Sequence, residues 1–419
     1  MRHLRIDDRD RVDYYTPSTA VFHDFCADIV DRYKLGDLIM QAKVDNIDYG
    51  DLGGLTSTEG FTLTTDKGAI FSKIVVLAVG PGYKPSIPLD SNLCLDNGQG
   101  SVCHCFDGSV GQHCLPEHVL RKIVRGHHTS VVVVGGGLTS AQIADLVIRR
   151  GVTKVWLLLR GKYKLKHFDV DLEWVSKVRN QQMAVFWSAV SDEGRVELLS
   201  QNRNWSMTVT LAERFELLSQ ARDGGSITPK FDKILKRHAA TDRLSVLTHT
   251  HITDGDWCSH SQTWSLGLSP MLETSPTCID HVIYATGAAP NIEKVACMQQ
   301  MMAKWPVPAI AGLPRLTDDL MWHEDVPLFL TGGLAGLRLG PGAANLAGAR
   351  QGAERIAWKV EDLLGEGQSS STDEDGSALG TMDGRRHGQR ESRFSVEGRS
   401  EYTGGFVNQF ETLAMDDTT

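Results

Sequence analysis

The stretch TSVVVVGGGLTSAQIADLVIRRGVTKVWLLLRGKYK, from Thr129 to Lys164, decides the fold class of this chain. Four valines precede three glycines, an amphipathic run extends to Gly151, and a second apolar run ends at Arg160. Apolar runs of strand length, separated by a glycine turn and a run with helical spacing, predict a strand, a tight turn, a helix and a second strand. The stretch therefore predicts a βαβ unit in an α/β fold.

The glycines have the spacing of a dinucleotide-binding turn. Gly135 leaves the turn unobstructed, Gly137 lets the backbone approach a pyrophosphate, and Ser140 is small enough for the helix to pack close to the strand. The N-terminal N–H groups of the helix would then face the phosphates. The alternative is a glycine-rich turn without a ligand. The predicted cofactor-binding residues here are Gly135, Gly136, Gly137, Thr139 and Ser140.

The end of the second strand indicates which dinucleotide would bind. An acidic residue about 20 residues after the glycines would bind the ribose hydroxyls of NAD(H). In this chain Arg160 stands at that distance, followed by Lys162, Lys164 and Lys166, and no carboxylate occurs before Asp169. A guanidinium fork suits a phosphate. We therefore predict NADP(H), with Arg160 and Lys162 in the site; the alternative is a solvated basic strand end.

Length and composition exclude several classes of function. The 419 residues predict two or three domains, and they are 41% hydrophobic and 23% charged, with a formal net charge of -9. No dense Lys/Arg run suggests nucleic acid. No apolar stretch approaches the roughly 18 residues of a membrane helix, and the cysteines form no disulfide framework. We expect a cytoplasmic protein that binds neither nucleic acid nor membrane, and a homo-oligomer is left open.

Two further apolar runs end alike, and a third closes the folded part of the chain. KIVVLAVGPGYKPSIP places Gly80 and Pro81 after a strand, and HVIYATGAAPNI places Thr286 and Gly287 after another. The segment PLFLTGGLAGLRLGPGAANLAGARQGAERI adds a strand, a glycine-rich turn and a helix. Its predicted site residues are Gly332, Gly333 and Pro341.

Together with the glycine turn, these segments resemble the two-dinucleotide-binding-domain flavoprotein oxidoreductases. Their order, with YYTPSTAVFHDFCADIV near the start, looks most like the lysine/ornithine N-hydroxylase and flavin-monooxygenase branch. The resemblance implies an FAD/NAD(P)-binding Rossmann-like fold with ββα/βαβ layers and an inserted second dinucleotide-binding domain. It also implies FAD and NADP(H) as cofactors, a small-molecule substrate and a monooxygenase-like reaction. The family usually has Gly-Asp where this chain has Gly332-Gly333.

The resemblance also suggests how the domains are divided. An FAD-type domain would comprise 1–124 and 291–365, an NADP(H)-binding domain 125–290, and a disordered tail 366–419. The family begins with its own strand–GxGxxG–helix unit, and nothing before Thr129 has that pattern. We therefore expect the chain to be N-terminally truncated relative to the family. The alternative function is a non-catalytic NADP(H)-binding sensor or interaction protein that has lost its FAD site.

Other residues, whose side chains could react or bind a metal, support weaker hypotheses. Cys103, Cys105, His113 and Cys114 lack zinc spacing, because the first pair is C-x-C, and we interpret them as part of an ordinary inter-domain segment. His281 is interpreted as a strand-edge histidine. No residue is assigned a catalytic role, because in flavin chemistry the cofactor carries the reaction and the protein positions it.

Overall fold

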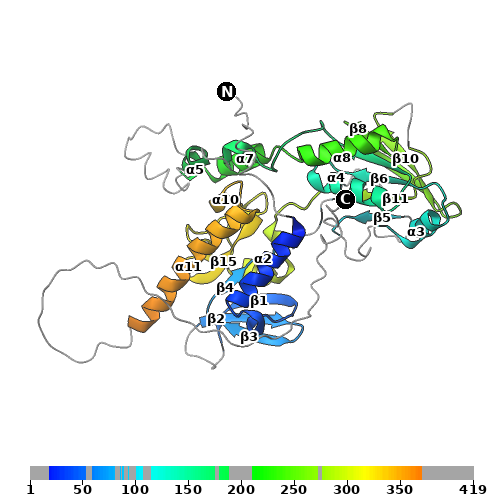
Figure 1. Cartoon of the computed structure of the whole chain (residues 1–419). Helices are drawn as coiled ribbons and strands as arrows, with labels where there is room; N and C mark the ends of the chain where they lie inside the picture. Colours follow the sequence, from blue (N-terminus) through cyan, green and yellow to red (C-terminus); the bar gives the residue numbers. More distant parts are fainter. Residues whose placement is uncertain are drawn as a thin grey trace, which may run out of the picture.

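The computed structural model describes residues 18–52, 59–80, 85, 87–88, 93, 101–106, 115–174, 179–187, 210–271 and 276–369. Pro81, His113 and Cys114 lie outside these ranges, as do residues 370–419. Within the described part of the chain the fold is mixed α/β, with helices beside several sheets (Figure 1). None of the described helices is both long and apolar enough to cross a membrane.

A five-stranded parallel sheet contains the two strands expected on either side of the glycine turn. Its strand order is β5-β11-β6-β7-β8. The strands are β5 (Val102–His104), β11 (His281–Tyr284), β6 (Ser130–Val134), β7 (Lys154–Leu159) and β8 (Leu244–Thr248). Every neighbouring pair is parallel, which places all the carboxyl ends of the strands at one edge. The predicted strand–turn–helix–strand unit is confirmed as β6, α4 (Leu138–Arg149) and β7.

Both faces of this sheet are covered, which explains why its strands are almost uniformly apolar. Val131 and Val133 point into a core shared with α4 and α8 (Pro229–Ala240). Val132 points to the other face, where it meets the hairpin of β9 (His251–Cys258) and β10 (Thr263–Ser269). The sheet is therefore the middle layer of a three-layer unit.

The segment 81–128, which connects the two sheets along the chain, contains regular structure among its described residues. It contributes the edge strand β5 and the helix α3 (Glu117–Val124). With only three residues, β5 is too short to show the alternation of a strand, and pairing with β11 holds it in place.

A second group of elements forms a separate core. A meander of β1 (Val44–Asp51), β2 (Glu59–Thr65) and β3 (Gly68–Ser72) packs with a sheet in the order β14-β15-β4. The latter strands are β14 (Met321–His323), β15 (Val326–Leu330) and β4 (Val75–Leu77), with β15 and β4 parallel. The helices α9 (Gln299–Lys304) and α11 (Leu346–Ser369) contribute Met301 and Ile356 to this core. Since α11 runs through Ser369, the helix extends past the expected tail boundary at 366.

The first described helix is α2 (Thr19–Arg32). Ser18 caps it, because its hydroxyl accepts a hydrogen bond from Val21 N at 3.3 Å, as the sequence predicts. Its apolar side chains are exposed, however, including Val21, Phe22 and Phe25. The structure therefore buries none of the described apolar side chains of α2.

Helices from the middle of the chain rest on the closing glycine-rich segment. These are α5 (Arg179–Trp187) and α7 (Leu211–Arg222), which lie beside α10 (Gly336–Leu339) in Figure 1. Leu211 and Leu337 share a small core, and Arg214 donates from Nη1 to the Leu337 carbonyl at 3.1 Å.

The smaller elements are β12 (Ala309–Ile310), β13 (Leu313–Pro314), η2 (Gly36–Leu38), η4 (Leu172–Trp174), η5 (Ile292–Lys294), η6 (Ala296–Met298) and η7 (Gly332–Ala335).

Candidate functional site

The glycine turn lies where the strand order of the parallel sheet changes direction. From β6 the chain moves to β7 and β8 on one side, whereas β11 and β5 lie on the other, so β6 and β11 flank the switch point. Gly135 has φ +154°, and a Cβ on it would lie 2.3 Å from the Ala285 carbonyl oxygen. Only glycine fits this approach. Ligands of open α/β sheets bind beyond the carboxyl ends of the strands at such a switch point.

The N-terminus of α4 follows the turn and presents unsatisfied backbone donors. Gly137 is the N-cap and has no side chain that could accept the first N–H groups. Ser140 is fully buried, and its hydroxyl donates to the Gly137 carbonyl at 2.7 Å. Thr139 is half-buried on the first turn of the helix. The geometry matches a site for an anion such as a pyrophosphate.

The four basic residues after β7 differ in what they contact. Lys164 Nζ pairs with Asp223 at 2.8 Å, and Lys166 Nζ pairs with Asp171 at 2.9 Å. Arg160 and Lys162 are exposed, and neither forms an ion pair with another described residue. These two side chains therefore remain available to a ligand at the carboxyl edge of the sheet.

The end of β11 completes this edge. Thr286 and Gly287 are half-buried, and Gly287 has φ +76° with no atom within 4 Å of the place where a Cβ would stand. The structure thus brings Gly135, Gly136, Gly137, Thr139, Ser140, Arg160, Lys162, Thr286 and Gly287 to one edge of one sheet.

The same edge also contains residues that were not predicted from the sequence. His104 ends β5 and is 2% exposed, and its Nδ1 accepts from Phe106 N at 3.2 Å. Cys105 N donates to the Tyr284 carbonyl at 2.8 Å, which ties the segment to β11. The sequence of this segment is CHCF, and of its four residues only Cys103 and Cys105 were considered, as metal ligands.

Gly80, Gly332 and Gly333 follow the carboxyl ends of the parallel strands β4 and β15. Gly80 has φ +54° and Gly332 has φ +70°, and no atom lies within 4 Å of a Cβ built on either. Thr331 N donates to the Leu77 carbonyl at 3.3 Å, which joins the two strand ends. Gly333 is half-buried beside Gly332. Pro341 is buried and lies five positions before Leu346, the first residue of α11.

The N-terminus of α11 is capped by its own chain. Asn345 Oδ1 accepts from Ala347 N at 3.0 Å and from Gly348 N at 3.2 Å. The resemblance leads one to expect this terminus to face a flavin ring, and in this chain a side chain already satisfies two of its donors. Arg338, in the preceding turn, donates to the Leu316 carbonyl at 2.7 Å and pairs with Asp318 at 2.6 Å. It therefore has a structural role.

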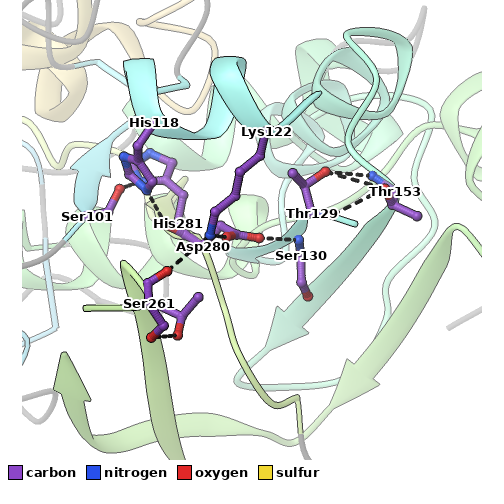
Figure 2. A network of polar contacts seen from close by, with 10 residues as sticks. Ser101, His118, Lys122, Thr129, Ser130, Thr153, Ser261, Asp280 and His281 are labelled. Atoms are coloured by element: carbon purple, nitrogen blue, oxygen red, sulfur yellow. Dashed lines mark hydrogen bonds and ion pairs between the residues drawn. The ribbon is translucent and has the colours of Figure 1, made fainter. Parts of the chain in front are cut away.

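His281 belongs to a polar network at the opposite, amino-terminal edge of the parallel sheet (Figure 2). Its Nδ1 lies 2.7 Å from Ser101 Oγ and its Nε2 lies 3.3 Å from Cys103 Sγ. The neighbouring Asp280 accepts from Ser130 N at 2.7 Å and pairs with Lys122 at 2.6 Å. Because this network ties β5, β6, β11 and α3 together on the side away from the glycine turn, we interpret it as structural.

Comparison with known proteins bears on the fold. No family model matches the chain, and no curated protein matches it. The reduced form of ornithine hydroxylase from Pseudomonas aeruginosa superposes with a TM-score of 0.58 at 16% identity, covering 85% of this chain and 79% of that one. The chain shares the Rossmann-like α/β fold of that protein. Ornithine N-hydroxylase from Kutzneria sp. 744, whose structure holds reduced FAD, NADP+ and L-ornithine, gives a TM-score of 0.57 at 16% identity, covering 85% and 80%.

Among the described residues, no group of three or more His, Cys, Asp or Glu side chains is arranged to hold a metal ion. Cys103 is buried within the polar network, and Cys105 directly follows the last residue of the same short strand. His113 and Cys114, the other two members of the sequence cluster, lie outside the described residues.

Proposed function

We propose that the chain is an NADPH-using, FAD-dependent oxidoreductase of monooxygenase-like type that acts on a small molecule. One observation carries the proposal. The glycine turn is closed onto Ala285 at the switch point, and Arg160 and Lys162 stand unpaired by any described residue at the end of the next strand.

The residues fit NADP(H) in three respects. The uncapped N-terminus of α4 offers N–H groups to the pyrophosphate. Gly137 carries no side chain that would obstruct close approach. Arg160 offers two parallel donors to a 2′-phosphate, and Lys162 adds a second positive charge.

The residues fit FAD in part. Gly80 and Gly332 leave open backbone at the carboxyl ends of β4 and β15, which suits a flat ligand lying against them. When bound, FAD supplies an acceptor for the nicotinamide hydride and, once reduced, reactivity toward oxygen. In this proposal the domain with β4 and β15 comprises 1–124 and 291–365, and the NADP(H)-binding domain comprises 125–290.

A second candidate function is a non-catalytic NADP(H)-binding sensor or interaction protein. One observation favours it: among the described residues, only the unit at β6 and α4 pairs a strand with a glycine turn of this spacing and a helix. The flavin absorbance of the purified protein separates the two candidates. Stoichiometric FAD, together with flavin reduction by NADPH, supports the oxidoreductase, whereas NADPH binding by a colourless protein supports the sensor.

The nucleotide assignment is tested by titrating NADPH and NADH against the parent and Arg160→Ala. We expect the parent to prefer NADPH. The variant should lose about tenfold or more of that preference, since a charge-assisted phosphate contact contributes about 1.5–3 kcal/mol. Equal affinities of the parent for both nucleotides would overturn the NADP(H) assignment.

A further inference from the structure

A short segment between α7 and α8 lies directly against the glycine turn. A Cβ on Gly225 would lie 2.8 Å from the Gly137 nitrogen and 2.9 Å from both the Gly136 carbonyl carbon and the Gly137 Cα. Conversely, a Cβ on Gly137 would meet the Gly225 Cα at 3.7 Å. The segment therefore contacts the glycine turn backbone to backbone, because Gly136, Gly137 and Gly225 have no side chains to keep them apart.

The chain enters this segment through two residues with left-handed backbone. Asp223 has φ +46° and ends α7, and Gly224 has φ +77°. Beyond Gly225, Ile227 N donates to the Lys164 carbonyl at 2.9 Å, and Lys166 N donates to the Ile227 carbonyl at 3.1 Å. At Ile227 the segment is thus paired with the basic run after β7.

Lys164 fixes the start of the segment with its side chain. Its Nζ lies 2.8 Å from Asp223 Oδ1 and donates to the Asp223 carbonyl at 2.6 Å. The side chain of Lys164 is one-third exposed and that of Asp223 is more than half exposed. Lys166 adds a weaker contact to the Arg222 carbonyl at 3.3 Å. Two of the four basic residues in the run, Lys164 and Lys166, therefore contact this segment through their side chains.

We propose that Lys164 is a positioning residue of the dinucleotide site, which holds Gly224 and Gly225 against the glycine turn. This inference rests on the proposed binding of NADP(H). The segment contacts Gly136 and Gly137, which belong to the turn that would bind the pyrophosphate shared by NADPH and NADH. Loss of the Lys164 contact should therefore weaken both nucleotides equally, whereas loss of Arg160 should weaken NADPH alone.

The test is titration of NADPH and NADH against the parent, Lys164→Met, Asp223→Asn and Arg160→Ala. We expect Lys164→Met to reduce both affinities by about three- to tenfold with their ratio unchanged, as fits a partly exposed ion pair with one charge-assisted hydrogen bond. Because Asp223→Asn removes part of the same contact, the double variant should lose less than the sum of the two single losses. Gly225→Ala should also weaken both nucleotides.

The matched control lies at the amino end of β7, the strand that precedes the basic run. Lys154 Nζ donates to the Asp242 carbonyl at 2.8 Å, and Asp242 also has left-handed backbone, with φ +56°. Lys154→Met removes the same kind of contact at the edge away from the glycine turn, so nucleotide affinity should stay at the parent value.

Three outcomes would overturn the inference while leaving NADP(H) binding intact. Lys164→Met could leave both affinities unchanged, or Lys154→Met could lower them equally well, which would indicate a general loss of stability. A much larger loss for NADPH than for NADH would make Lys164 a direct phosphate contact. If the parent binds neither nucleotide, the proposed function itself fails, and the two failures are distinct. Lys164→Arg, which keeps the charge, should restore most of the affinity.

Discussion

Gly135 and Ala285 approach each other so closely that a single added methyl group would not fit between them. A Cβ on residue 135 would lie 2.3 Å from the Ala285 carbonyl oxygen and 2.9 Å from its carbonyl carbon. Both atoms are backbone, and Ala285 N donates to the Val134 carbonyl at 2.8 Å, so neither side of the contact can move away easily. This contact aligns the ends of β6 and β11 around the proposed dinucleotide site.

Gly135→Ala should therefore destabilise the protein and abolish nucleotide binding. The variant combines a backbone clash with a positive φ, which alone costs about 1–3 kcal/mol. Urea unfolding and NADPH titration are the measurements. Gly136→Ala is the matched control, because its Cβ would meet only Leu159 side-chain atoms, at 3.7 Å and 3.8 Å. Equal stability of the two variants would mean that the close approach of Gly135 to Ala285 does not limit the size of residue 135.

The sequence predicted those parts of the fold that depend on local pattern. The valine run before Gly135 and the helical spacing after it indicated β6 and α4 directly, because a strand buried on both faces must be apolar throughout. Arg160 was placed correctly at the carboxyl edge of the sheet by its distance from the glycine turn. Its role in binding remains a prediction.

Features that depend on long-range packing could not be predicted from local pattern. β5 pairs with β11, which follows it by more than 170 positions, and no local pattern of three residues indicates that pairing. The lysines after Arg160 looked equivalent in sequence, yet Lys164 contacts Asp223 across the fold. Gly225 has no local motif, and its need for a bare backbone arises from contact with a turn that precedes it by nearly ninety residues.

Asp280→Asn should destabilise the protein by about 3 kcal/mol, because it breaks a buried ion pair. Asp280 is 2% exposed, pairs with Lys122 at 2.6 Å and accepts from Ser130 N (Figure 2). Thermal and urea unfolding measure the loss. Asp45→Asn is the control, since Asp45 pairs with Lys43 at the same 2.6 Å but on the surface, where such pairs contribute little. Similar losses in both variants would contradict the importance of burial.

His118 should make the stability of the protein fall in mildly acidic solution. Burial lowers the pKa of its imidazole below the ordinary value of 6.5, and the nearby Lys122 and Arg121 act in the same direction against a hydrogen bond to the Asp280 carbonyl. As the pH falls through 6.5, the unfolded chain takes up the proton before the folded protein does, so stability decreases until the folded pKa is passed. Above that window His118 contributes nothing to the pH dependence.

The measurement is the free energy of unfolding between pH 7.5 and about pH 5 for the parent and His118→Gln. The difference between the two proteins isolates this histidine from the other titrating groups. We expect the parent to lose more stability than the variant as the pH falls. Parallel curves would show that the folded environment does not disfavour the charged imidazole.

The last prediction concerns how α11 meets the end of β15. A Cβ on Gly352 would lie 2.5 Å from Thr331 Oγ1, which is buried and makes no hydrogen bond to any described residue. Gly352→Ala should therefore destabilise the parent by about 1–3 kcal/mol through overpacking.

In a Thr331→Ala background the clashing oxygen is absent, and the nearest remaining atom, Leu339 Cδ1 at 3.2 Å, belongs to a side-chain end that can shift. There the same substitution should stabilise the protein by up to about 1 kcal/mol, since alanine is the better helix former. Urea unfolding of the four proteins gives the coupling between the two positions. An equal loss in both backgrounds would mean that Gly352 is needed for a reason other than the close approach of α11 to Thr331, the residue before the open backbone at Gly332.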